Sequence, residues 1–300
     1  MQMATFDAMK LHSLRIVTLL LLSQFLFIFA GCDNFEHHPY AVKIDGPTGI
    51  NEASVSDICG RLTSLPLRFA FITDTQGAYD ELEDAIADIR TRRVDFIVHG
   101  GDQTDFGLPK EFMWCRDLMN RAGIPYITII GNHDCVGNGE ATFAYIYGRK
   151  NFSFTVAGVH FVCLNTNALE YDYSEPVPDL NFIEADAAEV NELNAAVPGS
   201  VTHTVAVMHS RPYDEQFNNN VAKPFLFYLK SYPGMREDDP ADPRGGHTHG
   251  FCINGHNHSM SISEIGDAGI LFYQCPNMAK RCYFIFTLTA DGYEMETVDY

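Results

Sequence analysis

Short apolar runs alternate with amphipathic segments near the start of this chain, and that alternation restricts the fold more than any other feature. The apolar runs are too short for helices and are predicted as buried strands, whereas the segments between them have apolar residues at helical spacing. In order, the pattern predicts strand 67–72, helix 79–92, strand 95–98, helix 110–121 and strand 126–130. Such alternation with short connections favours parallel pairing with right-handed crossovers.

The rest of the chain continues the mixed pattern and then becomes mainly strands. Further elements are predicted at 151–156, 159–164 and 203–208 as strands, and at 181–196 and 222–231 as helices. Residues 251–300 show the short alternating runs of strands joined by hairpins. The sequence therefore predicts an α/β fold.

Polar residues with metal-binding side chains follow five of the predicted strands. They are Asp74, Gly101-Asp102, Gly131-Asn132-His133-Asp134, His209 and Gly255-His256-Asn257-His258. The carboxyl ends of parallel strands share one edge of a sheet, where ligands bind. Carboxylate, amide oxygen and imidazole suit Mn, Fe or Zn, and a carboxylate can bridge two such ions. These strand ends therefore predict a metal site.

In their order and spacing these motifs resemble those of the calcineurin-like metallophosphoesterases. The family pattern is D-x-H, G-D-x-x-D, G-N-H-D/E, a lone His after a strand, and then G-H-x-H, and the resemblance covers about residues 67–300. It implies a four-layered α/β/β/α sandwich of two mixed sheets, with a dinuclear site at the strand carboxyl ends. It also implies a metal-dependent phosphoric ester hydrolase that uses two divalent ions (Mn, Fe or Zn).

The resemblance further implies a role for each matching residue. Asp74 and His258 would hold the first metal, Asp102 would bridge, and Asn132, His209 and His256 would hold the second. His133 would face the leaving group, with Asp134 orienting its ring, and Asp105 would have a supporting role. Attack on phosphorus would come from a metal-activated hydroxide, with a proton from His133 going to the departing oxygen.

One position departs from the family pattern. Gln76 occupies the third position of the first motif, where most relatives have a metal-binding His. Two interpretations remain open, because the amide oxygen of Gln76 can bind the metal weakly or its amide can hydrogen-bond to a ligand.

A second G-H-x-H match creates an ambiguity about the last motif. Gly246-His247-Thr248-His249 follows a turn signal, whereas Gly255 follows an apolar run predicted as a strand. We therefore assign the metal ligands to His256 and His258, and expect His247 and His249 in a loop at the cleft rim.

The organic substrate is constrained mainly by charge. The chain has 20 Lys+Arg and 39 Asp+Glu, a net charge of −19, which disfavours a nucleic-acid polymer and leaves a small phosphate mono- or diester. Asn132, His133 and Arg211 are candidate contacts to the phosphate. Residues 211–248, which include Arg236 and Arg244, are predicted to form a lid-like insertion.

The N-terminal segment predicts export and lipid anchoring. Residues 16–30 are apolar except for Thr18, Ser23 and Gln24. They follow Lys10 and Arg15 and lead into Phe29-Ala30-Gly31-Cys32. We interpret residues 1–31 as a lipoprotein signal peptide, Cys32 as the lipidated residue, and 32–66 as a tether to a bacterial membrane that contains one short helix near 52–62. A membrane anchor or a buried helix is the alternative for the apolar stretch. For the whole protein, the alternative to an enzyme is a metal-bearing surface lipoprotein that binds a ligand without turnover.

The remaining cysteines suggest little chemistry. Cys163 and Cys252 lie in apolar runs and are predicted as buried hydrophobes. Cys275 and Cys282 flank a short loop, and their spacing leaves open a disulfide across a hairpin.

Overall fold

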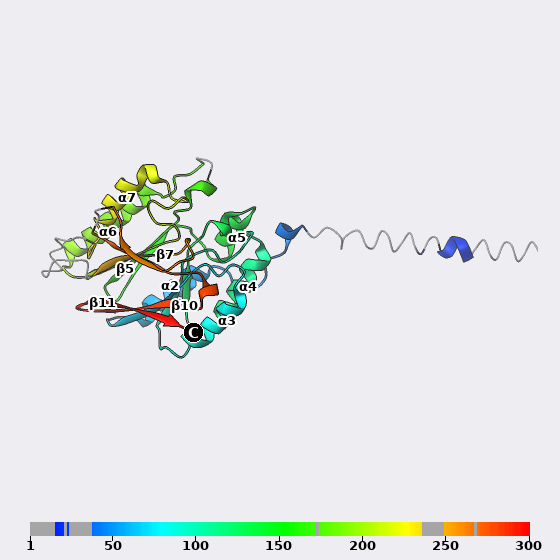
Figure 1. Cartoon of the computed structure of the whole chain (residues 1–300), viewed down its shortest axis with the longest axis horizontal. Coiled ribbons are helices and arrows are strands. Elements are labelled where there is room, and N and C mark those ends of the chain that lie inside the picture. The colour runs from blue at the N-terminus through cyan, green and yellow to red at the C-terminus, as the bar shows by residue number, and fades with distance from the viewer. Residues whose placement is uncertain (1–15, 21–22, 24–37, 172–173, 236–248, 267–268) are drawn as a thin grey trace, which may run out of the picture. The chain divides into compact units, whose positions relative to one another are not determined.

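The computed structural model describes residues 16–20, 23, 38–171, 174–235, 249–266 and 269–300 (Figure 1). The chain divides into two units, Met1–Val42 and Lys43–Tyr300. In the first unit, residues 16–20 are helical and η2 (Pro39–Ala41) is a 3-10 helix. Within the described ranges, no helix combines the length and hydrophobicity needed to cross a bilayer. Cys32 and most of the predicted signal peptide lie outside the described residues.

The second unit contains two mixed sheets. The first has the order β11 (Gly292–Asp299), β10 (Cys282–Thr289), β1 (Leu67–Ile72), β2 (Phe96–His99) and β3 (Tyr126–Thr128). Strands β1, β2 and β3 are parallel, and β10 runs antiparallel to both of its neighbours. The three strands predicted between residues 67 and 130 therefore form the parallel part of this sheet.

The second sheet has four parallel strands inside and an antiparallel strand at each edge. Its order is β4 (Phe152–Val156), β5 (Val159–Leu164), β6 (His203–Met208), β7 (Gly250–Asn254), β9 (Leu271–Gln274) and β8 (Ser261–Glu264). Strands β5, β6, β7 and β9 are the parallel ones. Strands β6 and β7, which precede His209 and His256, are therefore both central.

The two sheets pack face to face through an aromatic core. Phe69 of β1 lies with its ring centroid 5.4 Å from Phe96 of the same sheet and 5.4 Å from Phe161 of the other. All three side chains are fully buried, and neighbouring residues on each strand point to the opposite face. This core joins the two sheets into one body.

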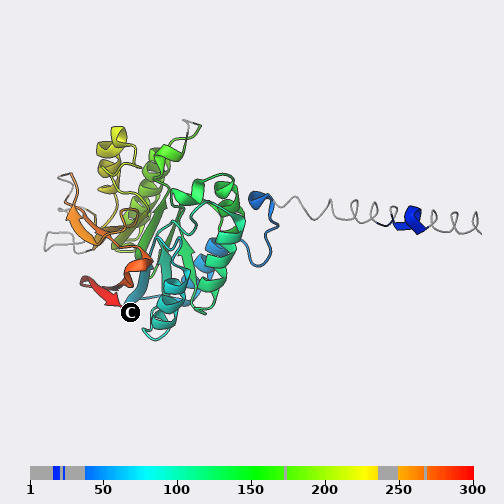
Figure 2. The same ribbon diagram turned by 45° about the vertical axis from the view of Figure 1, so that its right-hand side comes forward.

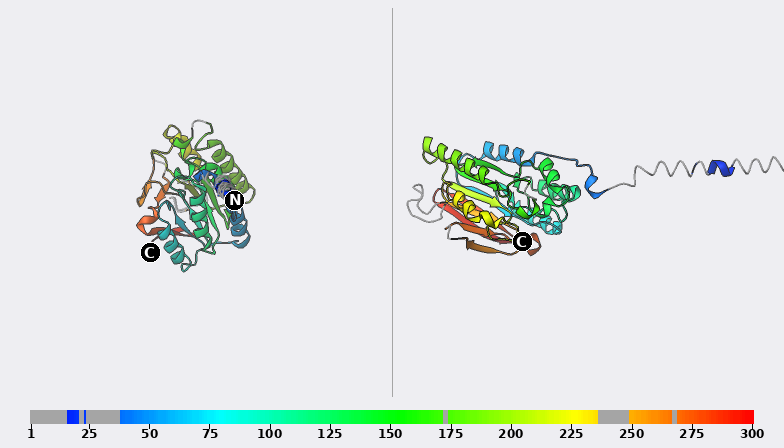
Figure 3. Two further views of the ribbon diagram at one scale, coloured as in Figure 1. Left: turned by 90° about the vertical axis from the view of Figure 1, so that its right-hand side faces the viewer. Right: turned by 90° about the horizontal axis from the view of Figure 1, so that it is seen from above.

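Helices cover the outer face of each sheet, as Figures 2 and 3 show. Helices α3 (Tyr79–Ile89), α4 (Pro109–Asn120) and α5 (Gly139–Ile146) pack on the first sheet. Helices α6 (Leu180–Ala196) and α7 (Ala222–Leu229) pack on the second. The predicted four-layered α/β/β/α sandwich is confirmed.

The folded unit begins earlier than the sequence suggested. Helix α2 (Ile50–Arg61) buries Ile58 in the core between the sheets. Asn51 donates from Nδ2 to the main-chain oxygen of Thr128 and accepts from its amide, both at 2.8 Å, so it pairs the free edge of β3. Residues 43–66 therefore belong to the folded unit rather than to a tether.

The predicted lid also differs from the structure. Helix α7 lies inside the 211–248 segment, but Phe225, Leu226 and Leu229 are buried against the second sheet. This helix is therefore part of the outer helical layer, because its apolar face is needed to cover the sheet. Arg236, Arg244 and His247 lie outside the described residues.

The possible disulfide does not form. All seven cysteines that the structure describes are free thiols, Cys275 and Cys282 among them. The 3-10 helix η6 (Met278–Lys280) separates the two, and the Cys275 thiol instead faces the main-chain oxygen of Phe71 at 3.8 Å. Cys163 and Cys252 are fully buried, as predicted.

Candidate metal centre and active site

The predicted metal ligands from the two sheets converge at the carboxyl ends of their strands. Asp74, Asp102 and His209 are buried, and each offers a ligand atom that lies within 4.8 Å of the others. They follow β1, β2 and β6, so the cluster lies where the parallel halves of both sheets end. Separate segments of the chain thus supply one site.

Asn132 is the centre of one set of donor atoms. Its Oδ1 lies 3.1 Å from Nε2 of His209 and 3.0 Å from Nδ1 of His256. Nε2 of His209 is also 3.2 Å from Oδ2 of Asp102. Ligand atoms that share one cation at about 2.1 Å, nearly at right angles, lie about 3 Å apart. The four donors therefore fit a shared divalent ion.

Asp74 is the centre of a second set. Its Oδ1 lies 3.3 Å from Nε2 of His258, and its carboxylate accepts from the amide of His256 at 3.1 and 3.2 Å. Thr73 donates its hydroxyl to the other carboxylate oxygen at 2.7 Å. Asp74 and His258 therefore fit a second ion adjoining the first.

Gln76 also lies at the centre, beside Asp102. With its amide nitrogen turned toward Asp102, Gln76 donates to the main-chain oxygen at 3.0 Å and to Oδ2 at 3.3 Å. That orientation satisfies the hydrogen bonds of both residues. Of the two interpretations of Gln76, the contacts favour the hydrogen-bonded one, in which the amide steadies a ligand.

Four of the expected ligands have left-handed backbone conformations. The φ angles are 52° for Asp74, 56° for Asp102, 74° for His256 and 54° for His258. Residues other than glycine rarely adopt such angles, and they cluster at functional sites. The backbone turns sharply directly after the strands, so that these side chains meet.

Two motif glycines allow the carboxylates to come so close. A Cβ atom on Gly131 would lie 2.1 Å from Oδ1 of Asp102, and one on Gly255 would lie 2.3 Å from Oδ2 of Asp74. Both distances are far below contact, so any side chain at these positions would displace a carboxylate. The glycines of G-N-H-D and G-H-x-H are thus required by packing as well as by the turn.

The buried carboxylates of the cluster need a positive charge to balance them. Burial alone would lower the pKa of His209, but the charges of Asp102 and Asp74 outweigh it and raise that pKa to about 10. The hydrogen bond to Asp74 raises the pKa of His258, whereas burial lowers that of His256. In the absence of metal a proton on His209 balances the buried carboxylates, and a divalent ion would displace it.

His133 is held by the main chain rather than by Asp134. It lies in the 3-10 helix η3 (His133–Cys135), and its Nδ1 is 3.0 Å from the carbonyl oxygen of Asp105. Because a carbonyl only accepts, Nδ1 carries the proton in this hydrogen bond. Asp105 thus supports His133 as expected, through its backbone.

Asp134 does not orient the ring of His133, so that prediction is wrong. Its Oδ1 accepts from the amides of Gln103 and Thr104 and from the Thr104 hydroxyl at 2.9 to 3.0 Å, and its Oδ2 accepts from Gly131 at 3.0 Å. Burial and the charge of Asp102 raise the pKa of Asp134 to about 7. This carboxylate joins the loops after β2 and β3, which carry the ligands.

Arg211 does not reach the cluster through any described hydrogen bond. Its guanidinium donates to the hydroxyls of Ser261 and Ser263 at 3.2 and 3.0 Å and contacts Asp214. These partners tie the loop after β6 to the edge strand β8. Nε and Nη1 of Arg211 are therefore engaged away from the cluster, and the phosphate contact of Arg211 stays a prediction.

The competing histidines lie elsewhere or fall outside the described residues. His249 directly precedes β7 and is buried, with its ring centroid 4.6 Å from that of His203. His256 follows the same strand at its other end. His249 is thus separated from the cluster by the length of β7, which agrees with the choice of His256 and His258. The predicted position of His249 at the cleft rim is wrong, because its side chain is buried at the opposite end of that strand.

Three residues after β5 also support the site, and the sequence analysis missed them. Asn167 donates from Nδ2 to the main-chain oxygen of Ile130 at 2.9 Å, and Thr166 accepts from the amide of Ser210 at 3.1 Å. Asn165 donates to the Tyr171 hydroxyl at 2.8 Å. These residues directly follow a predicted strand, so the strand-end rule that found the ligands would have found them too.

Fold and site together define a class of protein, a two-sheet α/β protein with a buried carboxylate–histidine cluster suited to metal at the strand ends. The sequence model of the calcineurin-like phosphoesterase family matches residues 67–260. The chain belongs to this family, and its class is that of metal-dependent phosphoric ester hydrolases. The family implies a dinuclear metal centre, which the donor atoms described above fit.

Solved structures share the fold at low sequence identity. A dimetal phosphatase from Danio rerio has a TM-score of 0.53 and 13% identity, over 79% of this chain and 100% of that chain. GAP50, described as the anchor in the inner membrane complex of Plasmodium, has a TM-score of 0.52 and 16% identity, over 78% of this chain and 84% of that chain. A purple acid phosphatase from yellow lupin has a TM-score of 0.56 and 11% identity, over 79% of this chain and 52% of that chain. No curated protein matches the sequence of this chain.

Proposed function

We propose that this protein hydrolyses a small phosphate mono- or diester with two divalent ions, Mn, Fe or Zn. One observation carries the proposal: the donor atoms of neighbouring side chains in the set Asp102, Asn132, His209 and His256 lie 3.0 to 3.2 Å apart. When bound, the ions would lower the pKa of a water molecule and neutralise the phosphoryl oxygens. Asp74 and His258 would hold the first ion, Asp102 would lie between both, and the other three residues would hold the second.

His133 is the proposed general acid. Its ring is fixed by the hydrogen bond from Nδ1 to the Asp105 carbonyl oxygen, and its amide donates to Oδ1 of Asp102 at 2.9 Å. The ring therefore cannot rotate away from the cluster without breaking this hydrogen bond. Protonated Nε2 would donate to the departing oxygen of the ester. Asn132 and His133 would also contact the phosphoryl group.

The experiment that tests the function is ester hydrolysis with matched variants. Purified protein loaded with Mn, Fe or Zn is assayed on p-nitrophenyl phosphate and bis(p-nitrophenyl) phosphate. His256→Ala should lose metal and activity, whereas Asn257→Ala, in the same exposed turn, should retain both. Turnover of neither ester by the wild type with any of the three metals would overturn the proposal.

In that event the ligand-binding alternative would take its place. Two observations motivate it: Gln76 replaces the usual histidine, and a protein of the same fold is described as an anchor. The retained His133 favours the enzyme, because a metal-binding protein needs Asn132 in that turn but has no use for the imidazole.

We also propose that the protein is exported and anchored to a bacterial membrane through a lipid on Cys32. The support is the apolar stretch 16–30 followed by Ala30-Gly31-Cys32. Cys32→Ser should abolish incorporation of labelled fatty acid in cells, while Cys59→Ser, which changes a thiol of helix α2, should leave it intact. Equal labelling of both variants would exclude the anchor.

A further inference from the structure

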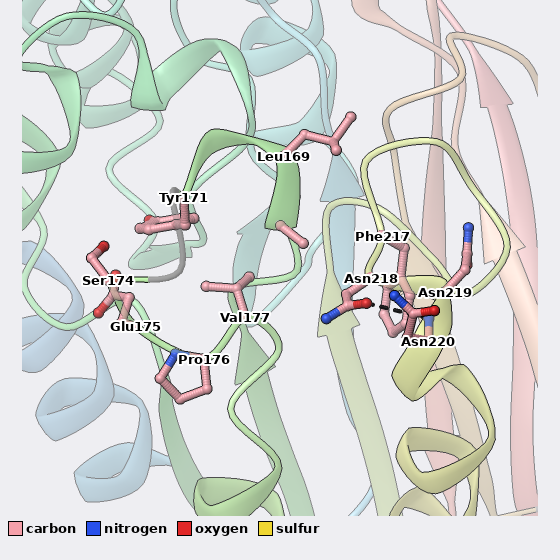
Figure 4. Close-up of a pocket in the computed structure, with 11 residues that line it drawn as sticks. Leu169, Tyr171, Ser174, Glu175, Pro176, Val177, Phe217, Asn218, Asn219 and Asn220 are labelled. Carbon is pink, nitrogen blue, oxygen red and sulfur yellow. Dashed lines mark hydrogen bonds between the residues drawn. The ribbon is translucent and has the colours of Figure 1, made fainter.

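We propose that a cavity beside the metal centre binds the uncharged organic part of the phosphate ester. The cavity has a volume of about 740 Å³ and lies between residues 168–171 and 174–177 on one side and residues 217–220 on the other (Figure 4). Its volume suits a sugar- or nucleoside-sized group. This inference rests on the proposed function and adds the class of substrate: an ester whose alcohol carries no charge.

One wall of the cavity is connected directly to the candidate catalytic segment. The Tyr171 hydroxyl accepts from Asn165 at 2.8 Å and lies 3.9 Å from the thiol of Cys135. Cys135 is two residues from His133, in the same 3-10 helix. A group seated against Tyr171 is therefore close to the proposed general acid.

The other wall is connected to the loop after β6. The amide of Ala168 donates to the main-chain oxygen of Gln216 at 2.8 Å, which joins the two walls. Asn219 accepts from the amide of Tyr213 at 2.8 Å and donates to the main-chain oxygen of Asp214 at 3.0 Å. The cavity thus opens between loops that follow β5 and β6, at the edge where the ligands lie.

The lining combines apolar surface with neutral amides. Leu169, from the 3-10 helix η4 (Ala168–Glu170), is 67% exposed and borders the cavity together with Val177. Across from them, Asn218 accepts from the main-chain amide of Asn220, and Figure 4 shows both residues on the side opposite Val177. Such a lining suits a group with an apolar face and several hydroxyl or amide groups.

Charge excludes a second anion from this cavity. Among the described lining residues only Glu175 is acidic. It is paired with Lys150, which also pairs with Glu140 and lies 4.8 Å from the Tyr171 ring. Among the described lining residues there is no Lys or Arg. A carboxylate on the alcohol would lose hydration without gaining a partner, in a chain whose net charge is −19.

The test compares two sugar phosphates that differ in one charge. Glucose 1-phosphate and glucuronic acid 1-phosphate have the same pyranose ring and the same phosphate position, but only the second carries a carboxylate, in place of the hydroxymethyl group. Each is used as a competitive inhibitor of nitrophenyl ester hydrolysis by the metal-loaded protein. We expect glucuronic acid 1-phosphate to have an inhibition constant at least about tenfold higher than that of glucose 1-phosphate.

A matched pair of variants separates the cavity from the overall charge. Leu169→Arg places a cation at the cavity and should lower the ratio of the two inhibition constants about five- to tenfold. Leu193→Arg makes the same substitution on helix α6, where the leucine is 45% exposed, and should leave the ratio unchanged. If Leu169→Arg does not fold, Asn220→Asp provides the opposite test and should raise the ratio.

The outcomes distinguish this proposal from the function on which it rests. A wild-type ratio near one, or an equal change in Leu169→Arg and Leu193→Arg, would overturn the cavity assignment while leaving the phosphoesterase intact. Failure to hydrolyse any nitrophenyl ester would overturn the function, and the cavity proposal with it.

Discussion

The Nδ1 atom of His133 lies 3.0 Å from the main-chain oxygen of Asp105, and the carboxylate of Asp134 makes its hydrogen bonds elsewhere. A backbone partner orients the ring and fixes its tautomer. The neighbouring Asp134 instead joins two loops. Function and stability are therefore separated between adjacent residues, and the two can be tested independently.

His133→Ala should lower kcat on an alkyl phosphate ester by about 10²- to 10⁴-fold, the usual contribution of a general acid. The loss should be smaller on a nitrophenyl ester, whose leaving group scarcely needs a proton. Asp105→Asn is the control, because its main-chain oxygen remains in place, and its kcat should stay near that of the wild type. Equal losses of His133→Ala on both esters would rule out proton donation.

Asp134→Ala should destabilise the fold more than it changes the chemistry. The substitution leaves the buried amides of Gln103, Thr104 and Gly131 without an acceptor, which should cost about 2–4 kcal/mol of the free energy of unfolding. Urea titration measures this free energy of unfolding. Asp57→Asn, which removes one partner of a surface ion pair, is the control and should change the free energy of unfolding by at most about 0.5 kcal/mol. A stable Asp134→Ala protein would contradict the structural role.

His209→Ala should remove bound metal, whereas His249→Ala should retain it. His209 is buried with Asp102 and Asp74, while the ring of His249 lies tilted against that of His203 before β7. Elemental analysis of the purified variants gives the metal content directly. Retention of metal by His209→Ala, or its loss in His249→Ala, would mean that the site has been placed at the wrong end of the strands.

Gln76→Ala should leave the metal content close to that of the wild type, because the amide of Gln76 hydrogen-bonds to Asp102 rather than binding an ion. Gln76→His should raise the affinity of the first metal, since imidazole is the better ligand for these ions. Competition with a graded series of chelators measures both variants. A marked loss of metal from Gln76→Ala would identify Gln76 as a ligand.

His203 should make the fold sensitive to mild acid. Burial, followed by the nearby charge of His249, lowers its pKa to about 4. An unfolded chain holds this histidine at its usual pKa of about 6.5, so it binds more protons than the folded chain between those values. Stability is therefore fully present above about pH 6.5 and falls as the pH drops toward 4, by about 2 kcal/mol at pH 5.

The measurement is the free energy of unfolding of wild type and His203→Phe at pH 7 and pH 5. The variant has no titrating group at this position, so its loss between the two pH values should be smaller. Identical losses in both proteins would show that other groups determine the acid sensitivity.

Local pattern was sufficient for the central elements and for the metal ligands. The apolar run 67–72 became β1, and the run before His209 became β6, because strands buried on both faces have few polar residues. Asp74, Asp102 and His209 could be grouped from sequence because each directly follows such a strand, and parallel strands share one edge.

Long-range packing decided the features that the pattern missed. The partner of His133 is a carbonyl oxygen, which every residue has, so no side-chain motif reveals it. The segment that contains α7 was predicted to be a lid, but the apolar face of this helix covers the second sheet. The cavity beside Tyr171 joins residues about 50 positions apart, and only the packing of β5 beside β6 brings those loops together.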